Sequence, residues 1–271
     1  PHSVSPTSTT IYSVIAQDAN GCVSLPQTIA INVLPPLSGN NTTITACDKD
    51  TVVLSFTLSS PGNGGPYSYN WQNGTYTPTL LTVADFNTNP NVFNVVVSDG
   101  CTVPDATVAI TLSVHPLPKG YFITDKKSGC EPLSITYTPI SNGTNDQYLW
   151  HFEGGTSSTS VTPTITYTTG IYSATLHITD QYGCQIDTVS VKDVTVFPKP
   201  IADFVPTPSV VSNVEPIVTF NNLSIGGTFY QWNFNDPYSN ANLSNEVNPI
   251  HYYEKPGEYE VALFVMNEFD C

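Results

Sequence analysis

A repeat with a period of about 80 residues, the size of a small independent β-domain, is the feature that most constrains how this chain can fold. Phrases that end in cysteine recur at nearly equal steps and close at Cys22, Cys101, Cys184 and Cys271. The three tryptophans keep nearly the same step, at Trp71, Trp150 and Trp232. Two further cysteines, Cys47 and Cys130, also keep it. Such a period is too long for a solenoid turn and indicates an array of domains.

Proline-rich joints divide the chain into repeats. They lie at residues 34–36, 115–118 and 197–200. We therefore expect the C-terminal part of one repeat at 1–36, full repeats at 37–118 and 119–200, and a repeat at 201–271 that is truncated at its last strand. The joints are short, which predicts neighbouring repeats placed end to end in a semi-rigid string.

Each repeat is built from short alternating segments. Residues 133–137, 147–152 and 172–178 alternate apolar with polar side chains, and glycine-containing turns separate them. Alternation of this kind predicts strands with one buried face, and no segment has a helical apolar face. The fold class expected is all-β, with tandem immunoglobulin-like sandwiches. Trp71, Trp150 and Trp232 are expected in the cores; the alternative for them is a surface platform that stacks on sugars.

Composition excludes several classes of function. The chain has 7 lysines and no arginine, with 22 acidic residues and a net charge of −15. Nucleic-acid binding needs clustered basic residues, so no nucleic-acid partner is expected, and an anionic membrane is disfavoured for the same reason. No apolar run is long enough for membrane insertion. No nucleophile, zinc-protease, phosphate-loop or dinucleotide motif is present, so we expect no enzyme and no cofactor.

The last repeat carries a family resemblance. Residues 229–235 read Phe-Tyr-Gln-Trp-Asn-Phe-Asn, and residues 248–267 read Asn-Pro-Ile-His-Tyr-Tyr-Glu-Lys-Pro-Gly-Glu-Tyr-Glu-Val-Ala-Leu-Phe-Val-Met-Asn. This resembles the PKD domain pattern, and residues 148–155 and 167–178 resemble it less fully. PKD domains are β-sandwich modules of extracellular proteins. Strings of them with cysteine-ended phrases resemble the giant surface adhesins of gliding bacteria, the SprB type, which a type IX system secretes.

An extracellular setting makes disulfides the favoured state of the cysteines. The stretch from Cys47 to Cys101 is as long as that from Cys130 to Cys184, which predicts these two disulfides; the alternative is free buried thiols. Cys22 is expected to pair upstream of residue 1. In the last repeat Val214 stands where the preceding repeat has Cys130, so Cys271 is expected to pair downstream or to remain free.

Ligand and modification sites are few. Calcium is the one plausible ion, with Asp48, Asp50 and Asp236 as candidate oxygen donors, and solvated turn residues as the alternative. Acidic residues in the cysteine-ended phrases are further donors: Asp18, Asp99, Asp180 and Glu268. Thr51 and Thr188 lie in Asp-Thr-Val, which resembles a bacterial O-glycosylation signal. His251 is expected to be a structural hydrogen-bonding residue, and Tyr252 and Tyr253 are candidates for sugar contact.

The function predicted is mechanical. The chain is expected to be a segment of a long cell-surface adhesin or filament that extends an adhesive tip and bears force, in adhesion or gliding motility. Its expected partners are neighbouring repeats of the same chain, with surface glycans or other cell-surface proteins beyond them. The alternatives are a spacer or polysaccharide-binding module of a secreted hydrolase, and a sugar-binding module in its own right.

Overall fold

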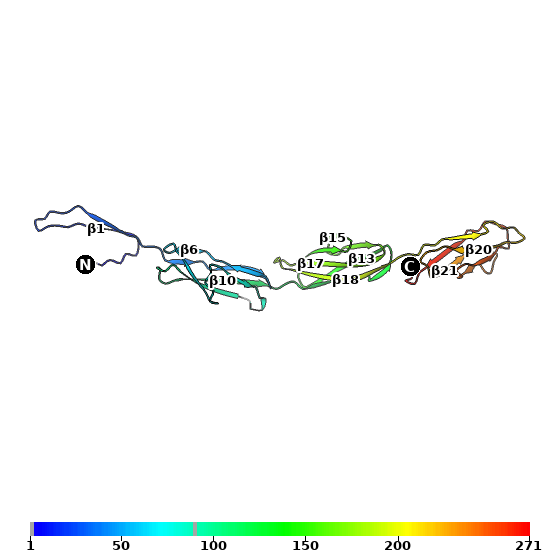
Figure 1. Ribbon diagram of the computed structural model, residues 1–271, viewed down its shortest axis with the longest axis horizontal. Helices are drawn as coiled ribbons and strands as arrows, with labels where there is room; N and C mark the ends of the chain where they lie inside the picture. The colour runs from blue at the N-terminus through cyan, green and yellow to red at the C-terminus, as the bar shows by residue number, and fades with distance from the viewer. Residues whose placement is uncertain (1–2, 89–90) are drawn as a thin grey trace. The chain divides into compact units, whose positions relative to one another are not determined.

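The computed structural model describes residues 3–88 and 91–271 (Figure 1). Within these ranges the chain is all-β, and its single helical turn is the 3-10 segment Phe86–Thr88. No helix there is long and apolar enough to cross a membrane. By internal contacts the chain divides into two compact units. The first runs to Leu117 and includes Tyr182–Cys184; the second holds Pro118–Gln181 and Gln185–Cys271.

The first 36 residues contribute one hairpin. β1 (Thr10–Val14) pairs antiparallel with β2 (Gln27–Ile31), Thr10 opposite Ile31 (blue in Figure 1). Several of its apolar side chains are exposed, including Ile11 at 70%, Val14 at 67% and Ile29 at 65%. A two-stranded ribbon cannot bury both faces, so the described residues of this hairpin form no core of their own.

The repeat that follows is a sandwich with alternating buried positions. Its main sheet has the order β4-β10-β9-β7, and the pairs β3-β6 and β5-β8 complete it. In β10 every second residue from Ala106 to Val114 is buried, which is the burial that its alternating sequence predicts. The strands are β3 (Leu37–Gly39), β4 (Thr42–Cys47), β5 (Thr51–Leu54), β6 (Leu58–Pro61), β7 (Ser68–Trp71), β8 (Leu80–Val83), β9 (Asn91–Ser98) and β10 (Ala106–His115).

The third repeat has a three-stranded sheet, β11-β13-β16, and a five-stranded sheet, β12-β18-β17-β14-β15. Its core joins aliphatic side chains of both sheets to Tyr137, Trp150 and Phe152. The strands are β11 (Gly120–Thr124), β12 (Ser128–Cys130), β13 (Leu133–Ser141), β14 (Gln147–Phe152), β15 (Ser157–Ser158), β16 (Thr164–Tyr167), β17 (Gly170–Thr179) and β18 (Gln185–Phe197).

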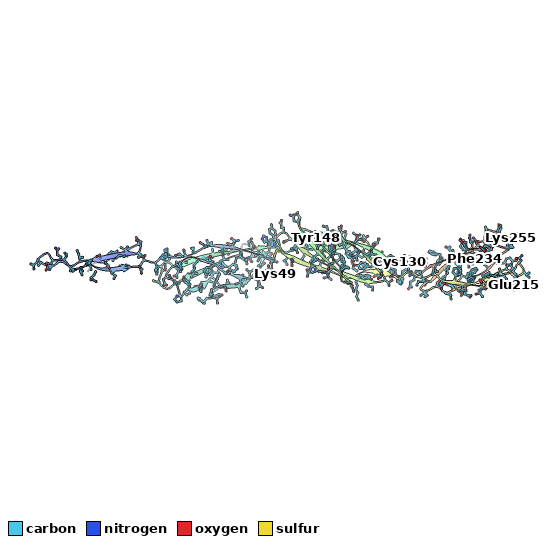
Figure 2. The ribbon with its side chains drawn as sticks, turned by 90° about the horizontal axis from the view of Figure 1, so that it is seen from above. Lys49, Cys130, Tyr148, Glu215, Phe234 and Lys255 are labelled. Carbon is cyan, nitrogen blue, oxygen red and sulfur yellow. A yellow bond between two sulfur atoms is a disulfide. The ribbon has the colours of Figure 1, made fainter. Side chains whose placement is uncertain are left out.

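The fourth repeat has two three-stranded sheets, β19-β20-β23 and β22-β21-β24. They match the strands of the third repeat, except that the described residues hold no counterparts of β12 and β18, the two strands that lie on the open side of β17. The strands are β19 (Phe204–Thr207), β20 (Ile217–Asn222), β21 (Phe229–Asn233), β22 (Leu243–Ser244), β23 (Ile250–Tyr252) and β24 (Ala262–Met266). Phe234, which follows β21, lies inside this sandwich (Figure 2).

The three tryptophans occupy the same place in each sandwich. Trp71, Trp150 and Trp232 have exposed fractions of 1%, 0% and 0%. Each indole Nε1–H donates to a backbone carbonyl of the loop that follows, at 2.8, 3.0 and 2.8 Å. A buried indole needs such a partner, so the tryptophans are core anchors and are not placed to stack on a sugar.

Candidate functional site: disulfides between repeats

The opening cysteine of a repeat lies where that repeat leads into the next. β4 runs parallel to β10, and their register places Cys47 opposite His115, the last residue of β10. β12 runs parallel to β18 in the same way, with Cys130 opposite Phe197. Parallel strands end at the same edge of a sheet. Both cysteines therefore lie beside the proline-rich joint that follows their repeat.

Each of these cysteines forms a disulfide with the closing cysteine of the next repeat. Cys47 is bonded to Cys184 and Cys130 to Cys271, with sequence separations of 137 and 141 residues and Cα–Cα distances of 5.5 Å in both. Cys184 directly precedes β18 of the third repeat, and Cys271 follows β24 of the fourth. The two bonds are thus the same connection made twice, one repeat apart.

The predicted pairs Cys47–Cys101 and Cys130–Cys184 are wrong. Cys101 precedes β10, whereas Cys47 lies at the far end of that strand. The strand holds its two ends about 30 Å apart, far beyond the ~7 Å limit for a disulfide. The longer β18 separates Cys130 from Cys184 in the same way. The two predicted pairs are separated by the same number of residues because the sequence repeats, and this equal separation does not bring the cysteines close in space.

An aromatic stack accompanies each disulfide. His115 stacks on Tyr182 with ring centroids 3.9 Å apart and planes at 9°. Phe197 stacks on Phe269 at 4.0 Å and 6°. In both cases the first ring ends the closing strand and the second lies two positions before the bonded cysteine. At the second joint the Asn267 side-chain amide also donates to the Pro198 carbonyl at 2.8 Å.

The turn that presents the closing cysteine is held by the side chain of an Asp or Asn. The backbone N–H of Cys22 donates to Asp18 at 2.8 Å, and that of Cys271 donates to Asn267 at 2.9 Å. In the second repeat Asp99 accepts from the Cys101 N–H at 3.0 Å and from the Thr102 N–H and hydroxyl. These hydrogen bonds, led by that of the Thr102 hydroxyl, hold the pKa of Asp99 well below its ordinary range.

Asp18 and Asp99 therefore anchor turns. The described residues hold no cluster of side chains that would support the predicted calcium site. Among the described residues no group of three or more His, Cys, Asp or Glu side chains could hold a metal ion. Asp48 accepts from the Phe86 N–H, which lowers its pKa, and Asp50 accepts from the Cys47 N–H. Asp236 is fully buried and accepts from His251 Nε2 at 3.1 Å.

His251 is the structural hydrogen-bonding residue that the sequence predicted. It is 3% exposed, stacks on Phe234 with centroids 4.3 Å apart, and donates to Asp236. A buried carboxylate and a buried imidazole satisfy one another here, as the interior requires. The turn at Asn235-Asp236-Pro237 is thus tied to β23 by this hydrogen bond.

The glycosylation and sugar-contact candidates differ in accessibility. Thr51, at the start of β5, is exposed. Thr188 is half-buried and its hydroxyl donates to the Gly120 carbonyl at 2.9 Å, so its oxygen is engaged. Tyr252 is 54% exposed, whereas Tyr253 is 7% exposed and burial raises its pKa to about 12. Of the two tyrosines, only Tyr252 presents a ring to solvent.

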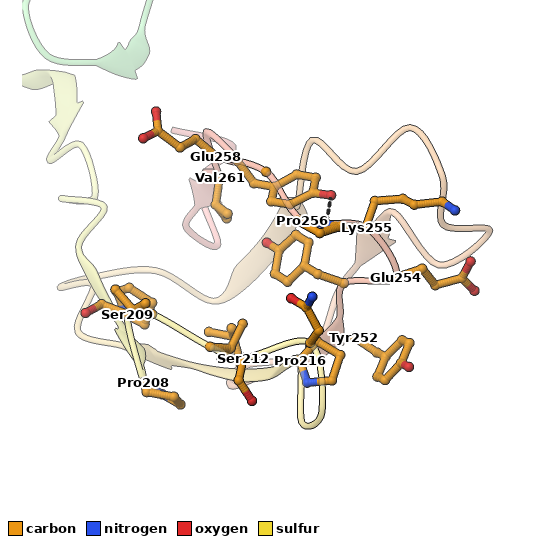
Figure 3. A pocket seen from close by; sticks show the side chains of 18 of the residues that line it. Pro208, Ser209, Ser212, Pro216, Tyr252, Glu254, Lys255, Pro256, Glu258 and Val261 are labelled. Carbon is orange, nitrogen blue, oxygen red and sulfur yellow. Dashed lines mark hydrogen bonds between the residues drawn. The ribbon is translucent and has the colours of Figure 1, made fainter.

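A cavity of about 840 Å³ opens in the fourth sandwich (Figure 3). Proline and valine side chains of residues 206–218 line one side, and Tyr253, Tyr259 and Val261 line another. Tyr259 donates its hydroxyl to the Lys255 carbonyl at 2.9 Å. Figure 2 shows Glu215 and Lys255 near the end of the sandwich where this cavity opens.

The third repeat shows what fills this space. There Tyr167 and Tyr172 correspond to Tyr253 and Tyr259. The ring centroids of the two pairs are 4.1 and 4.2 Å apart, and in each pair the second tyrosine donates to a carbonyl four positions back. The same core contains Val194 and Val196 of β18. The fourth repeat has no counterpart of β18 in its described residues. In the third repeat, side chains of β18 occupy the corresponding part of the core.

The disulfide partners are what sequence reasoning missed. The sequence contained a signal for this pairing. Val214 leaves Cys271 without a partner in its own repeat, and one repeat earlier the equivalent position is Cys130. The expectation that Cys271 pairs downstream or stays free is wrong, since Cys130 holds it. Cys22 and Cys101 are the free cysteines of the described residues, and both are exposed.

Comparison with known proteins finds a family match that covers most of the third repeat. The family described as PKD domain matches residues 121–196. Among solved structures, the eight N-terminal Ig domains of Down Syndrome Cell Adhesion Molecule are 13% identical at a TM-score of 0.47, covering 96% of this chain and 40% of that one. An I-band fragment of titin is 11% identical at 0.40, covering 86% and 94%. The fibronectin(III)-like modules of Clostridium thermocellum CbhA are 12% identical at 0.31, covering 58% and 91%.

The chain is thus a tandem array of immunoglobulin-like β-sandwiches, one of which matches the PKD domain. Disulfides persist in oxidising compartments, and two of them join this array. Together these features indicate a structural module of an extracellular or secreted protein.

Proposed function

We propose that this chain is a load-bearing segment of a long cell-surface adhesin or filament, which holds an adhesive part away from the cell during adhesion or gliding. The observation that carries the proposal is the pair of overlapping disulfides. The Cys47–Cys184 bond spans residues 47–184 and the Cys130–Cys271 bond spans residues 130–271, so the two covalent loops interlock over residues 130–184.

The overlap shortens the path along which tension travels. Along the backbone, the path from Cys47 to Cys271 includes every residue between them. Through the disulfides the shortest covalent path crosses to Cys184, returns along the chain to Cys130 and crosses again. At about 3.5 Å per extended residue, the first path reaches ~780 Å and the second only ~200 Å. Force can unfold a sandwich in this segment without extending the chain to its full contour length, because the disulfides keep the covalent path short.

Single-molecule pulling from both ends tests the proposal. The oxidised chain should yield ~600 Å less contour length than the reduced chain, which is the extended length of the backbone that the bonds withhold. A Cys47→Ser/Cys130→Ser variant, pulled without reductant, should behave like the reduced chain. Equal contour lengths in oxidised and reduced wild type would contradict the load-bearing role. Binding of the chain to a polysaccharide would instead favour a module of a secreted hydrolase.

A further inference from the structure

Two histidines meet on the outward face of the third sandwich. In β14 the buried Trp150 and Phe152 alternate with His151, and in β17 the buried Leu176 and Ile178 flank His177. Because side chains alternate across a strand, both histidines point away from the core. β14 and β17 are adjacent and antiparallel, and their register makes the two residues diagonal neighbours. Their ring centroids are 4.9 Å apart with planes at 81°.

A second residue orients each imidazole. Ser157 of β15 lies opposite His151 of β14, and its hydroxyl is 2.9 Å from His151 Nδ1. Asp187 lies opposite His177 across β18, and its carboxylate accepts from His177 Nδ1 at 2.5 Å. The four side chains form one row across four strands, in the order Ser157, His151, His177, Asp187. Both Nδ1 atoms are turned to the ends of the row.

The remaining nitrogen of each ring, Nε2, is available to a metal ion. Within the described residues neither Nε2 has a hydrogen-bond partner. An imidazole that binds a metal through one nitrogen characteristically gives the other to a carboxylate or another polar group, which fixes its tautomer. Two imidazoles that share an ion about 2.1 Å from each nitrogen have centroids about 5 Å apart when the angle at the metal is about 100°. The observed 4.9 Å fits this separation.

We propose that His151 and His177 form a surface site for a divalent transition metal ion of the kind that prefers imidazole, such as Cu²⁺, Zn²⁺ or Ni²⁺. Both rings reach solvent, and the His177 side chain is 33% exposed. Two protein nitrogens leave the other coordination positions to water or to a donor from another molecule. The affinity order should be Cu²⁺ above Ni²⁺ and Zn²⁺, and Ca²⁺, which takes oxygen ligands, should not compete.

The test is calorimetric titration of the full chain with CuCl₂ and with ZnCl₂. The background should carry His2→Gln, Cys22→Ser and Cys101→Ser, which removes the N-terminal imidazole and the two free thiols as competing ligands. One equivalent of each metal should bind. His151→Gln and His177→Gln should each weaken binding at least ~10-fold, because one nitrogen ligand is lost, and Asp187→Asn should weaken it by ~10-fold through the orientation of His177.

His115→Gln is the matched control, since this imidazole stacks on Tyr182 away from the row, and it should leave the affinity unchanged. Proton NMR gives an independent readout: Zn²⁺ should shift the ring signals of His151 and His177 together, and not those of His251. The proposal is overturned if the background protein binds neither Cu²⁺ nor Zn²⁺ at a metal concentration of about 1 mM. It is also overturned if both histidine variants bind the metals as tightly as the background protein does.

Discussion

Cys47 lies directly opposite His115 in the parallel pairing of β4 with β10. His115 ends the last strand of its repeat, and its ring stacks on Tyr182, two positions before the cysteine that bonds to Cys47. Strand register, aromatic stack and disulfide therefore converge on one joint. The same three features recur at Cys130, Phe197 and Phe269.

Thiol labelling checks the disulfide connection. Under denaturing, non-reducing conditions a maleimide should label Cys22 and Cys101 alone, because the other four cysteines are bonded. Cys184→Ser should add Cys47 to the labelled set, and Cys271→Ser should add Cys130. Release of Cys130 instead of Cys47 by the Cys184 variant would show that the pairs lie within repeats after all.

Asp99 should make the second repeat sensitive to acid. Its pKa is lowered in the folded state by accepted hydrogen bonds, so its stabilising contribution is full above the unfolded-state pKa of about 3.9 and is lost as pH falls from there through the folded-state pKa. Asp99→Asn should therefore lower the free energy of unfolding at pH 7, and the difference from wild type should shrink below about pH 4. Urea unfolding at pH 7, 5 and 3 measures this.

The control for Asp99 is Asp105→Asn, an exposed carboxylate of the same loop. It should change the unfolding free energy by no more than about 0.5 kcal/mol at any of these pH values. A difference for Asp99→Asn that stays constant from pH 7 to pH 3 would mean that its hydrogen bonds do not depend on ionisation.

Trp232 should be the most sensitive position of the fourth sandwich. It is fully buried, packs against Phe204 and Phe220, and donates to the Glu246 carbonyl. Trp232→Ala should cost roughly 3–5 kcal/mol, which corresponds to amide exchange in β21 and β24 faster by about two to four orders of magnitude. Hydrogen exchange with mass spectrometry measures it. Phe264→Ala on the outward face of β24, 56% exposed, should leave exchange nearly unchanged.

A strand supplied beside β24 should fill the cavity of the fourth sandwich. Fusing the sequence of residues 185–197 after Cys271 offers the two side chains that Val194 and Val196 place in the third core. Each buried valine contributes on the order of 1.5–3 kcal/mol, so the melting temperature of this repeat should rise. A fusion carrying Asp in place of both valines should give no rise; equal stabilisation by both fusions would show that the strand does not enter the cavity.

The sequence determined the strands, the tryptophan-centred cores and the repeat, because alternation and period are local properties of the chain. Leu133–Tyr137 alternates, and its apolar residues are buried as that pattern predicts. His251 was also interpreted correctly, from its place in a local motif. These features need only near neighbours to be specified.

The tertiary structure decided which distant residues meet. Cys47 and Cys101 are in the same repeat, yet the full length of β10 holds them at opposite ends. His151 and His177 lie on different strands and meet only because those two antiparallel strands pair in one register. Spacing along a chain records where residues stand in a repeat, but the direction and register of strand pairing set the distance between them. For this reason the repeat could be predicted from the sequence, and the disulfides that join neighbouring repeats could not.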